Sequence, residues 1–217
     1  MIAWLNWLAG CVCHLDDSSF AAVVGGNVAF CARCSGVYVG LLAGLAFALL
    51  ARRGKASLPP RWLFAVQIAS LAAMAIAGFG SLYGVIELSV WAKFAVGSAF
   101  GQTLGCFAGE VIKHWSARCI AQRWPKREAV AYLVLGVCVA CLPLLGQRAP
   151  FLWLFITIAS ASGLVAGLCS ANLLLAKALA RGKGWRGRWS AASVPLVVAA
   201  CAAELLVLRG WRWWWLQ

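Results

Sequence analysis

Residues 31–51 read CARCSGVYVGLLAGLAFALLA, and this stretch decides the fold. A C-x-x-C pair opens it, and a run without charged residues follows from position 35 to the residue before Arg52. Gly36, Gly40 and Gly44 recur at every fourth residue, which places them on one helix face and permits close contact with another helix. The pattern predicts a membrane-spanning helix that starts near Gly36, with cysteines at its beginning.

The composition extends this prediction to the whole chain. Of the 217 residues, 64% are hydrophobic and 12% are charged, whereas a soluble domain has about 25% charged residues. Most of the apolar surface is therefore expected to face lipid, in apolar stretches near the roughly 20 residues that cross a bilayer. The sequence predicts an all-α, polytopic transmembrane helix bundle of about six spans with the lipid bilayer as its partner. The predicted spans are 36–51, 62–82, 92–112, 129–146, 151–176 and 190–208.

The flanking segments complete the predicted domain organisation. Residues 1–34 are expected to form an N-terminal interfacial segment and a Cys/His loop, with a short tryptophan-containing helix in the membrane interface. Residues 35–209 then form the transmembrane bundle. Residues 210–217 form a Trp-rich tail of the kind that lies at a membrane surface.

The charge pattern predicts the orientation. A net charge of +13 is compatible with nucleic-acid binding, but the basic residues lie in short clusters between apolar spans, which is typical of membrane orientation. Fourteen of the 19 Lys and Arg residues fall in the loops after spans one, three and five. The positive-inside rule places these loops in the cytoplasm and both termini outside. No cleavable signal peptide is evident, because the first ten residues carry no positive charge. We therefore expect a multi-pass membrane protein with no nucleic-acid partner.

Four soft ligands flank the loop before the first span. Cys13 and His14 are adjacent, and Cys31 and Cys34 form the C-x-x-C pair. Thiolates and neutral imidazole are zinc ligands, and two such pairs brought together by a loop can supply the four donors of a tetrahedral ion. Because neighbouring residues cannot easily both face one metal, Cys11 is an additional candidate ligand. The sequence predicts a metal site here, with zinc as the expected ion.

The same cysteines support an alternative. Cys31 and Cys34 can form a disulfide or cycle between thiol and disulfide, and an oxidising compartment outside the membrane favours this. They would then be the catalytic pair of a membrane thiol–disulfide oxidoreductase that exchanges electrons with a quinone. Arg33 lies between them, and its charge is expected to lower a neighbouring thiol pKa, which helps both functions. The residues leave both hypotheses open, together with a third in which these side chains have no joint role.

This segment also resembles a known family. C-H at 13–14, S-F at 19–20 and C-x-R-C-S-G-x-Y-x-G at 31–40 resemble small bacterial and archaeal membrane proteins catalogued as domain of unknown function 2085. A weaker echo follows at 84–101, so the resemblance covers roughly the first half of the chain. Ser18 replaces an arginine of the family pattern, and acidic residues replace a proline-containing stretch before it. The resemblance implies a protein of a bacterial inner membrane and strengthens the Cys/His site, but it implies no activity.

Polar and thiol side chains also fall inside predicted spans. Glu204 is costly in lipid unless it is paired, protonated or facing water, and Lys93 at the start of span three is its candidate partner. The carboxylate marks either an ion or proton pathway or a side chain that reaches the head groups. Cys138 and Cys141 form a second C-x-x-C on one face of span four. Their spacing suits soft-metal passage or electron exchange, although small-residue packing is the commoner role.

Two functions follow. The first is an integral membrane protein with an extracytoplasmic zinc-binding cap, which acts as a small transporter or as a membrane subunit beside other subunits of a larger complex. The second is the thiol oxidoreductase with its quinone. No P-loop, hydrolase elbow or paired catalytic carboxylate is visible, so ATP-driven or hydrolytic chemistry is not expected. Whether the protein is an enzyme stays open at this level.

Overall fold

The computed structural model describes most of the predicted bundle. The described residues are 13, 30–52, 55–56, 59–114, 120–121, 124–146, 151–182, 197 and 199–208. The predicted interfacial helix before residue 13 and the Trp-rich tail after residue 209 lie outside them, so the division of the chain into three segments stays a prediction.

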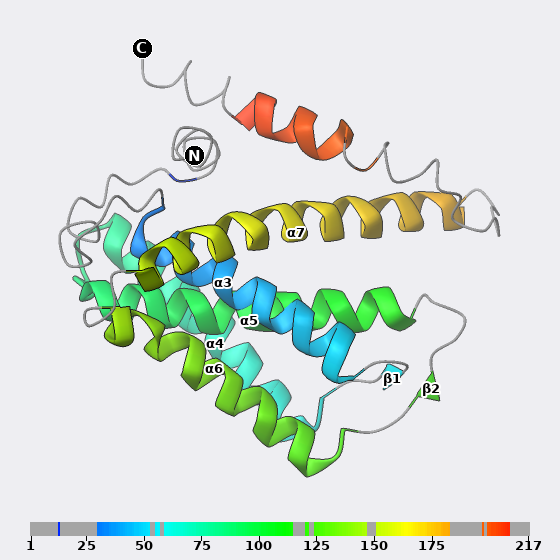
Figure 1. Cartoon of the computed structure of the whole chain (residues 1–217), viewed down its shortest axis with the longest axis horizontal. Coiled ribbons are helices and arrows are strands. Elements are labelled where there is room, and N and C mark those ends of the chain that lie inside the picture. Colours follow the sequence, from blue (N-terminus) through cyan, green and yellow to red (C-terminus); the bar gives the residue numbers. More distant parts are fainter. Residues whose placement is uncertain are drawn as a thin grey trace.

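Within the described residues the chain is helical apart from two very short strands, which confirms the all-helical fold class (Figure 1). The helices are α3 (Ala32–Ala46), its π-helical continuation η1 (Phe47–Ala51), α4 (Arg61–Leu82), α5 (Val90–His114), α6 (Lys126–Gly146) and α7 (Phe151–Gly182). A shorter apolar helix covers Ala199–Leu208. The strands β1 (Lys55–Ala56) and β2 (Ile120–Ala121) have two residues each.

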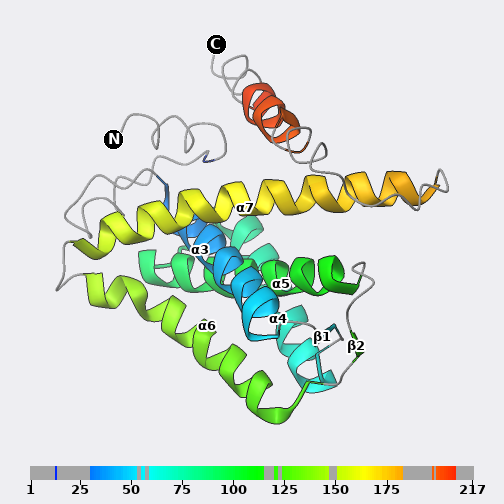
Figure 2. The same cartoon turned by 45° about the vertical axis from the view of Figure 1, so that its right-hand side comes forward.

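The helices alternate in direction, as they do when a chain crosses a membrane repeatedly. In Figures 1 and 2, α3, α5 and α7 run one way, and α4 and α6 run the other way. The links that follow α3 and α5 therefore meet at one end of the bundle, where β1 and β2 pair in parallel with Lys55 opposite Ile120. The beginning of α3 lies at the opposite end, and Cys13 lies beside it, because its Sγ accepts a hydrogen bond from the backbone N–H of Cys31. The two ends are distinct, and their assignment to the outside and the cytoplasm stays a prediction.

Four of the described helices are long and apolar enough to span a membrane: Ala32–Ala51, Arg61–Ser81, Lys126–Leu145 and Leu154–Ala176. The helix α5 covers predicted span three but is not one of them. It packs against α3, α4, α6 and α7, and it buries Gln102, Thr103 and Glu110 among these neighbours. Polar residues are tolerated there because other helices, rather than lipid, surround them. The helix at 199–208 is shorter than predicted span six, so the count of six stays a prediction.

The centre of the bundle is a parallel contact between α3 and α5, backbone against backbone. A Cβ atom built on any of six glycines would lie closer than 3.0 Å to a backbone atom of the other helix. Only hydrogen fits in such places, and van der Waals packing of this kind is what holds helices together in lipid. The six glycines are Gly36, Gly40 and Gly44 of α3 and Gly97, Gly101 and Gly105 of α5.

The outer helices present apolar surface instead. The share of the spanning segment that is buried inside the protein is 17% for α4 and 22% for α6, against 44% for the segments of α3 and α7. The exposed side chains of α4 and α6 include Phe64, Phe79, Val134 and Val137. A soluble protein rarely exposes so much apolar surface, so these faces are the lipid-facing sides of the bundle.

Candidate metal centre

Three cysteines meet where α3 begins. The Sγ atoms of Cys13, Cys31 and Cys34 all lie within 4.8 Å of one another. Two sulfur ligands of one tetrahedral zinc ion are about 3.8 Å apart when each Zn–S bond is about 2.3 Å. The cluster therefore needs only a small contraction to hold an ion. Cys13 reaches it from 18 residues before Cys31, so this part of the site is made by tertiary structure.

The start of the helix positions two of the sulfurs. Cys31 is the N-cap of α3, and its Sγ accepts a hydrogen bond of 3.4 Å from the backbone N–H of Cys34. The backbone N–H of Cys31 in turn donates to Sγ of Cys13 at 3.3 Å. Backbone donors at a helix N-terminus favour negative charge, and a metal ion binds the thiolate form of cysteine.

The neighbouring thiols oppose that charge. The pKa of Cys31 is raised above its ordinary value, first by its side-chain hydrogen bond with Cys13 and further by burial, while Cys34 lowers it. Arg33 is not among the causes of this shift, so its predicted lowering of a neighbouring thiol pKa stays a prediction. Nη2 of Arg33 instead donates to the carbonyl of Ala77 at 3.3 Å and to Oγ of Ser81 at 3.0 Å, near the end of α4. A bound cation would supply the positive charge that these thiolates need.

The cluster lies in an apolar environment. Cys13 is 8% exposed and Cys31 is 6% exposed. They belong to a hydrophobic cluster with Phe30, with Leu164 of α7 and with Leu205 of the helix at 199–208. The thiols therefore join the N-terminal segment to three separate helices of the bundle.

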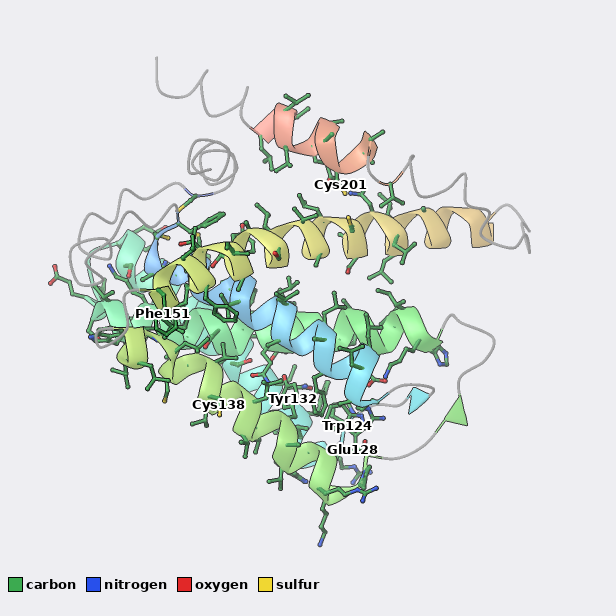
Figure 3. All side chains as sticks on the ribbon, viewed as in Figure 1. Trp124, Glu128, Tyr132, Cys138, Phe151 and Cys201 are labelled. Atoms are coloured by element: carbon green, nitrogen blue, oxygen red, sulfur yellow. The ribbon has the colours of Figure 1, made fainter. Side chains whose placement is uncertain are left out.

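Other predicted site residues are placed as follows. His14 and Cys11 lie outside the described residues, so the fourth donor stays a prediction. Cys138 is exposed, and Figure 3 shows it on the outer side of α6, while Cys141 is half-buried. Their suggested roles in metal passage or electron exchange stay predictions.

Glu204 does have a partner in the described residues. Its Oε2 accepts a hydrogen bond of 2.9 Å from Nδ2 of Asn172, which lies on α7. The amide thus meets the requirement that a carboxylate in lipid be paired. The suggested pairing with Lys93 stays a prediction.

The opposite end of the bundle holds a buried ion-pair network that the sequence analysis did not identify. Arg52 is 0% exposed; its Nε lies 2.9 Å from Oε1 of Glu110, and its Nη1 lies 2.7 Å from Oε2 of Glu128. The Arg52 guanidinium also lies 4.1 Å from the centre of the Trp124 ring. Nζ of Lys113 lies 2.9 Å from the same Glu110 oxygen. Two cations and two carboxylates therefore balance one another inside the protein.

A local distortion places Arg52 there. The helix α3 ends in the π-helical turn η1, and the backbone N–H of Arg52 bonds to the carbonyl of Phe47. A π-helical turn is wider than an α-helical one and changes the direction in which the next residues project. The i, i+3 spacing of Glu110 and Lys113 is visible in the sequence, but the approach of Arg52 and Glu128 from two other segments is not.

These features define a polytopic helical membrane protein with a cluster of three thiols, two of them buried, at one end of its bundle. A family described as "Predicted membrane protein (DUF2085)" matches residues 13–107, which contain the thiol cluster, α3, α4 and most of α5. The resemblance inferred from the sequence is thereby confirmed, and this part of the chain is similar to that family. No curated protein and no solved structure matches the chain.

Proposed function

We propose that Cys13, Cys31 and Cys34 bind zinc, with His14 or Cys11 as the fourth donor, and form a cap that fastens the N-terminal segment to the bundle. The observation that carries this proposal is the meeting of three Sγ atoms within 4.8 Å. Two of these sulfurs also accept backbone N–H bonds. Thiolate-rich sets of this kind select zinc among the common divalent ions of cells, because magnesium and calcium prefer oxygen ligands.

On this proposal the cap lies on the outer face of the cytoplasmic membrane. The thiols lie at the beginning of α3, whereas Arg52 follows η1 and Lys113 lies in the last turn of α5, at the opposite end of the bundle. The positive-inside rule then assigns the basic end to the cytoplasm.

The number of protein ligands separates the two roles that the cap supports. Four protein ligands close a zinc site, which suits a structural cap on a membrane subunit of a larger complex. Three protein ligands leave a position open for exchange, which suits a small transporter. Variants of His14 and Cys11 therefore test the ligand set, and they also distinguish a structural cap from a transporter site.

One observation favours a second candidate function. Cys31 and Cys34 are a C-x-x-C pair at a helix N-terminus, where redox-active thiols are often found. In that reaction the two thiols lose two protons and two electrons and form a disulfide, while a membrane quinone takes them up and becomes the hydroquinone. Metal binding and this reaction compete for the same sulfurs.

We expect Cys31→Ser to reduce bound zinc by about one equivalent per chain relative to the wild type, because serine replaces one of the few thiolate ligands. The measurement is elemental analysis of the purified full-length protein, with thiol counting before and after reduction. Cys138→Ser is the matched control, since its side chain lies on the outer side of α6.

The same measurement is applied to His14→Ala and Cys11→Ser. The variant that removes the fourth donor is expected to bind zinc more weakly than the wild type. Wild-type protein that binds no zinc and contains a reducible Cys31–Cys34 bond would overturn the cap and favour the redox function.

A further inference from the structure

We propose a second site for a thiophilic divalent cation, formed by Cys169 and Cys201 with Glu204, between α7 and the helix at Ala199–Leu208. This site shares no residue with the cap and lies outside the family match at 13–107. It rests on a contact between two helices that are far apart in the sequence. Neither cysteine belongs to a C-x-x-C pair.

The geometry brings two thiols together and places one of them, with a carboxylate, at one amide. Sγ of Cys201 lies 3.8 Å from Sγ of Cys169. Nδ2 of Asn172 lies 3.3 Å from Sγ of Cys201 and 2.9 Å from Oε2 of Glu204. Asn172 is 8% exposed, as is Cys201. Each helix contributes its two residues at i and i+3, so all four face the same contact.

The sulfur separation suits a metal ion. The 3.8 Å between the two Sγ atoms equals the distance of about 3.8 Å expected between two thiolates on one tetrahedral ion. On binding, the two S–H bonds break, the two protons leave to solvent, and the divalent ion takes their place between the sulfurs. No electron is transferred.

The electrostatics of the membrane favour this arrangement. Two thiolates neutralise a divalent cation, and an uncompensated charge in lipid is costly. Glu204, whose Oε2 accepts from the same Asn172 amide as Sγ of Cys201, is the proposed third donor, and that amide partly offsets the remaining negative charge. Asn172 acts as a positioning residue, because one amide group donates to both a sulfur and a carboxylate.

An apolar layer separates this site from the cap. Leu205, which follows Glu204, belongs to the buried cluster that contains Cys13, Cys31 and Leu164. Leu168, which precedes Cys169, packs against the same cluster. Two thiol sites therefore flank one apolar layer along α7. The idea that both sites take the same class of ion rests on the proposed function. The existence of the second site does not depend on that function.

Cadmium titration of the purified full-length protein tests the site, because cadmium–thiolate bonds give an ultraviolet charge-transfer band. We expect the band to saturate at about two equivalents in the wild type, and at about one in a Cys169→Ser/Cys201→Ser variant. The matched control is Cys138→Ser/Cys141→Ser, which is expected to behave as the wild type. The Cys31→Ser variant is expected to lose only the equivalent of cadmium that binds at the cap. The two variants therefore test the two sites separately.

Two further measurements do not depend on the folding of a cysteine variant. In the wild type, bound cadmium should protect Cys169 and Cys201 from N-ethylmaleimide, as read by peptide mass spectrometry. Asn172→Ala should weaken the second equivalent about 10- to 100-fold without removing it, as expected when a residue that orients ligands is lost.

The proposal is overturned if the Cys169→Ser/Cys201→Ser variant keeps the full wild-type band, or if cadmium leaves both thiols reactive in the wild type. It is also overturned if the two thiols form a disulfide and, once reduced, bind no cadmium.

Discussion

Gly101→Ala is expected to destabilise the protein by about 3 kcal/mol or more, because the new methyl group has no space. A Cβ at this position would overlap the carbonyl of Val37 on α3, and a backbone atom cannot turn away as a flexible side chain can. Alanine is the better helix former by about 1 kcal/mol, so helix propensity works against the expected loss. The clash should therefore exceed the propensity gain and separate α3 from α5. Denaturant titration of the purified protein in detergent measures the change.

Gly78→Ala is the matched control for this experiment. Gly78 lies within α4, and a Cβ there would meet nothing within 4 Å. The same substitution is therefore expected to be neutral or to stabilise the protein by up to about 1 kcal/mol. If the free energies of unfolding of the Gly101→Ala and Gly78→Ala variants agree, the close contact between α3 and α5 does not hold the bundle together.

Arg52→Met is expected to cost about 3–5 kcal/mol, the usual result when one partner of a buried ion pair is removed. Methionine keeps much of the side-chain volume but removes the guanidinium that contacts both Glu110 and Glu128. It also removes the cation over the Trp124 ring. Because the network is buried, added salt should change this loss little. The measurement is the free energy of unfolding at low and high salt.

Two variants separate charge from packing. Arg61→Met replaces an exposed arginine at the beginning of α4 and should stay within about 0.5 kcal/mol of the wild type. Arg52→Met combined with Glu110→Gln and Glu128→Gln removes both carboxylate charges and should recover much of the lost stability. A triple variant no more stable than Arg52→Met would show that packing, rather than charge balance, is the role of Arg52.

The network also changes how the basic residues of the chain are understood. In the sequence, Arg52 is one of many positive charges that follow a span and predict orientation. In the structure it is fully buried and joins the end of α3 to α5 and α6. A charge that predicts orientation can thus also fix the packing of three helices. Counting charges along a sequence does not distinguish the two roles.

The cysteine site shows where prediction from spacing ends. The C-x-x-C pair and its position before an apolar run are local features, and both are visible in the sequence. The contact of Cys13 with Cys31 and Cys34 depends on how the intervening chain returns, and the structure provides it. Cys169 and Cys201 gave no comparable signal, because they are single residues in two separate apolar stretches.

The sequence by itself determined that this protein is a bundle of membrane helices, because composition and hydrophobic length follow from the residues alone. It also placed Gly36, Gly40 and Gly44 on one helix face, because residues four apart lie one above another. Only the tertiary structure decided that this face meets the glycines of α5, that Arg52 turns inward, and that Asn172 reaches Glu204. Periodicity describes each helix separately, whereas pairing depends on the fit between surfaces that are distant in the chain.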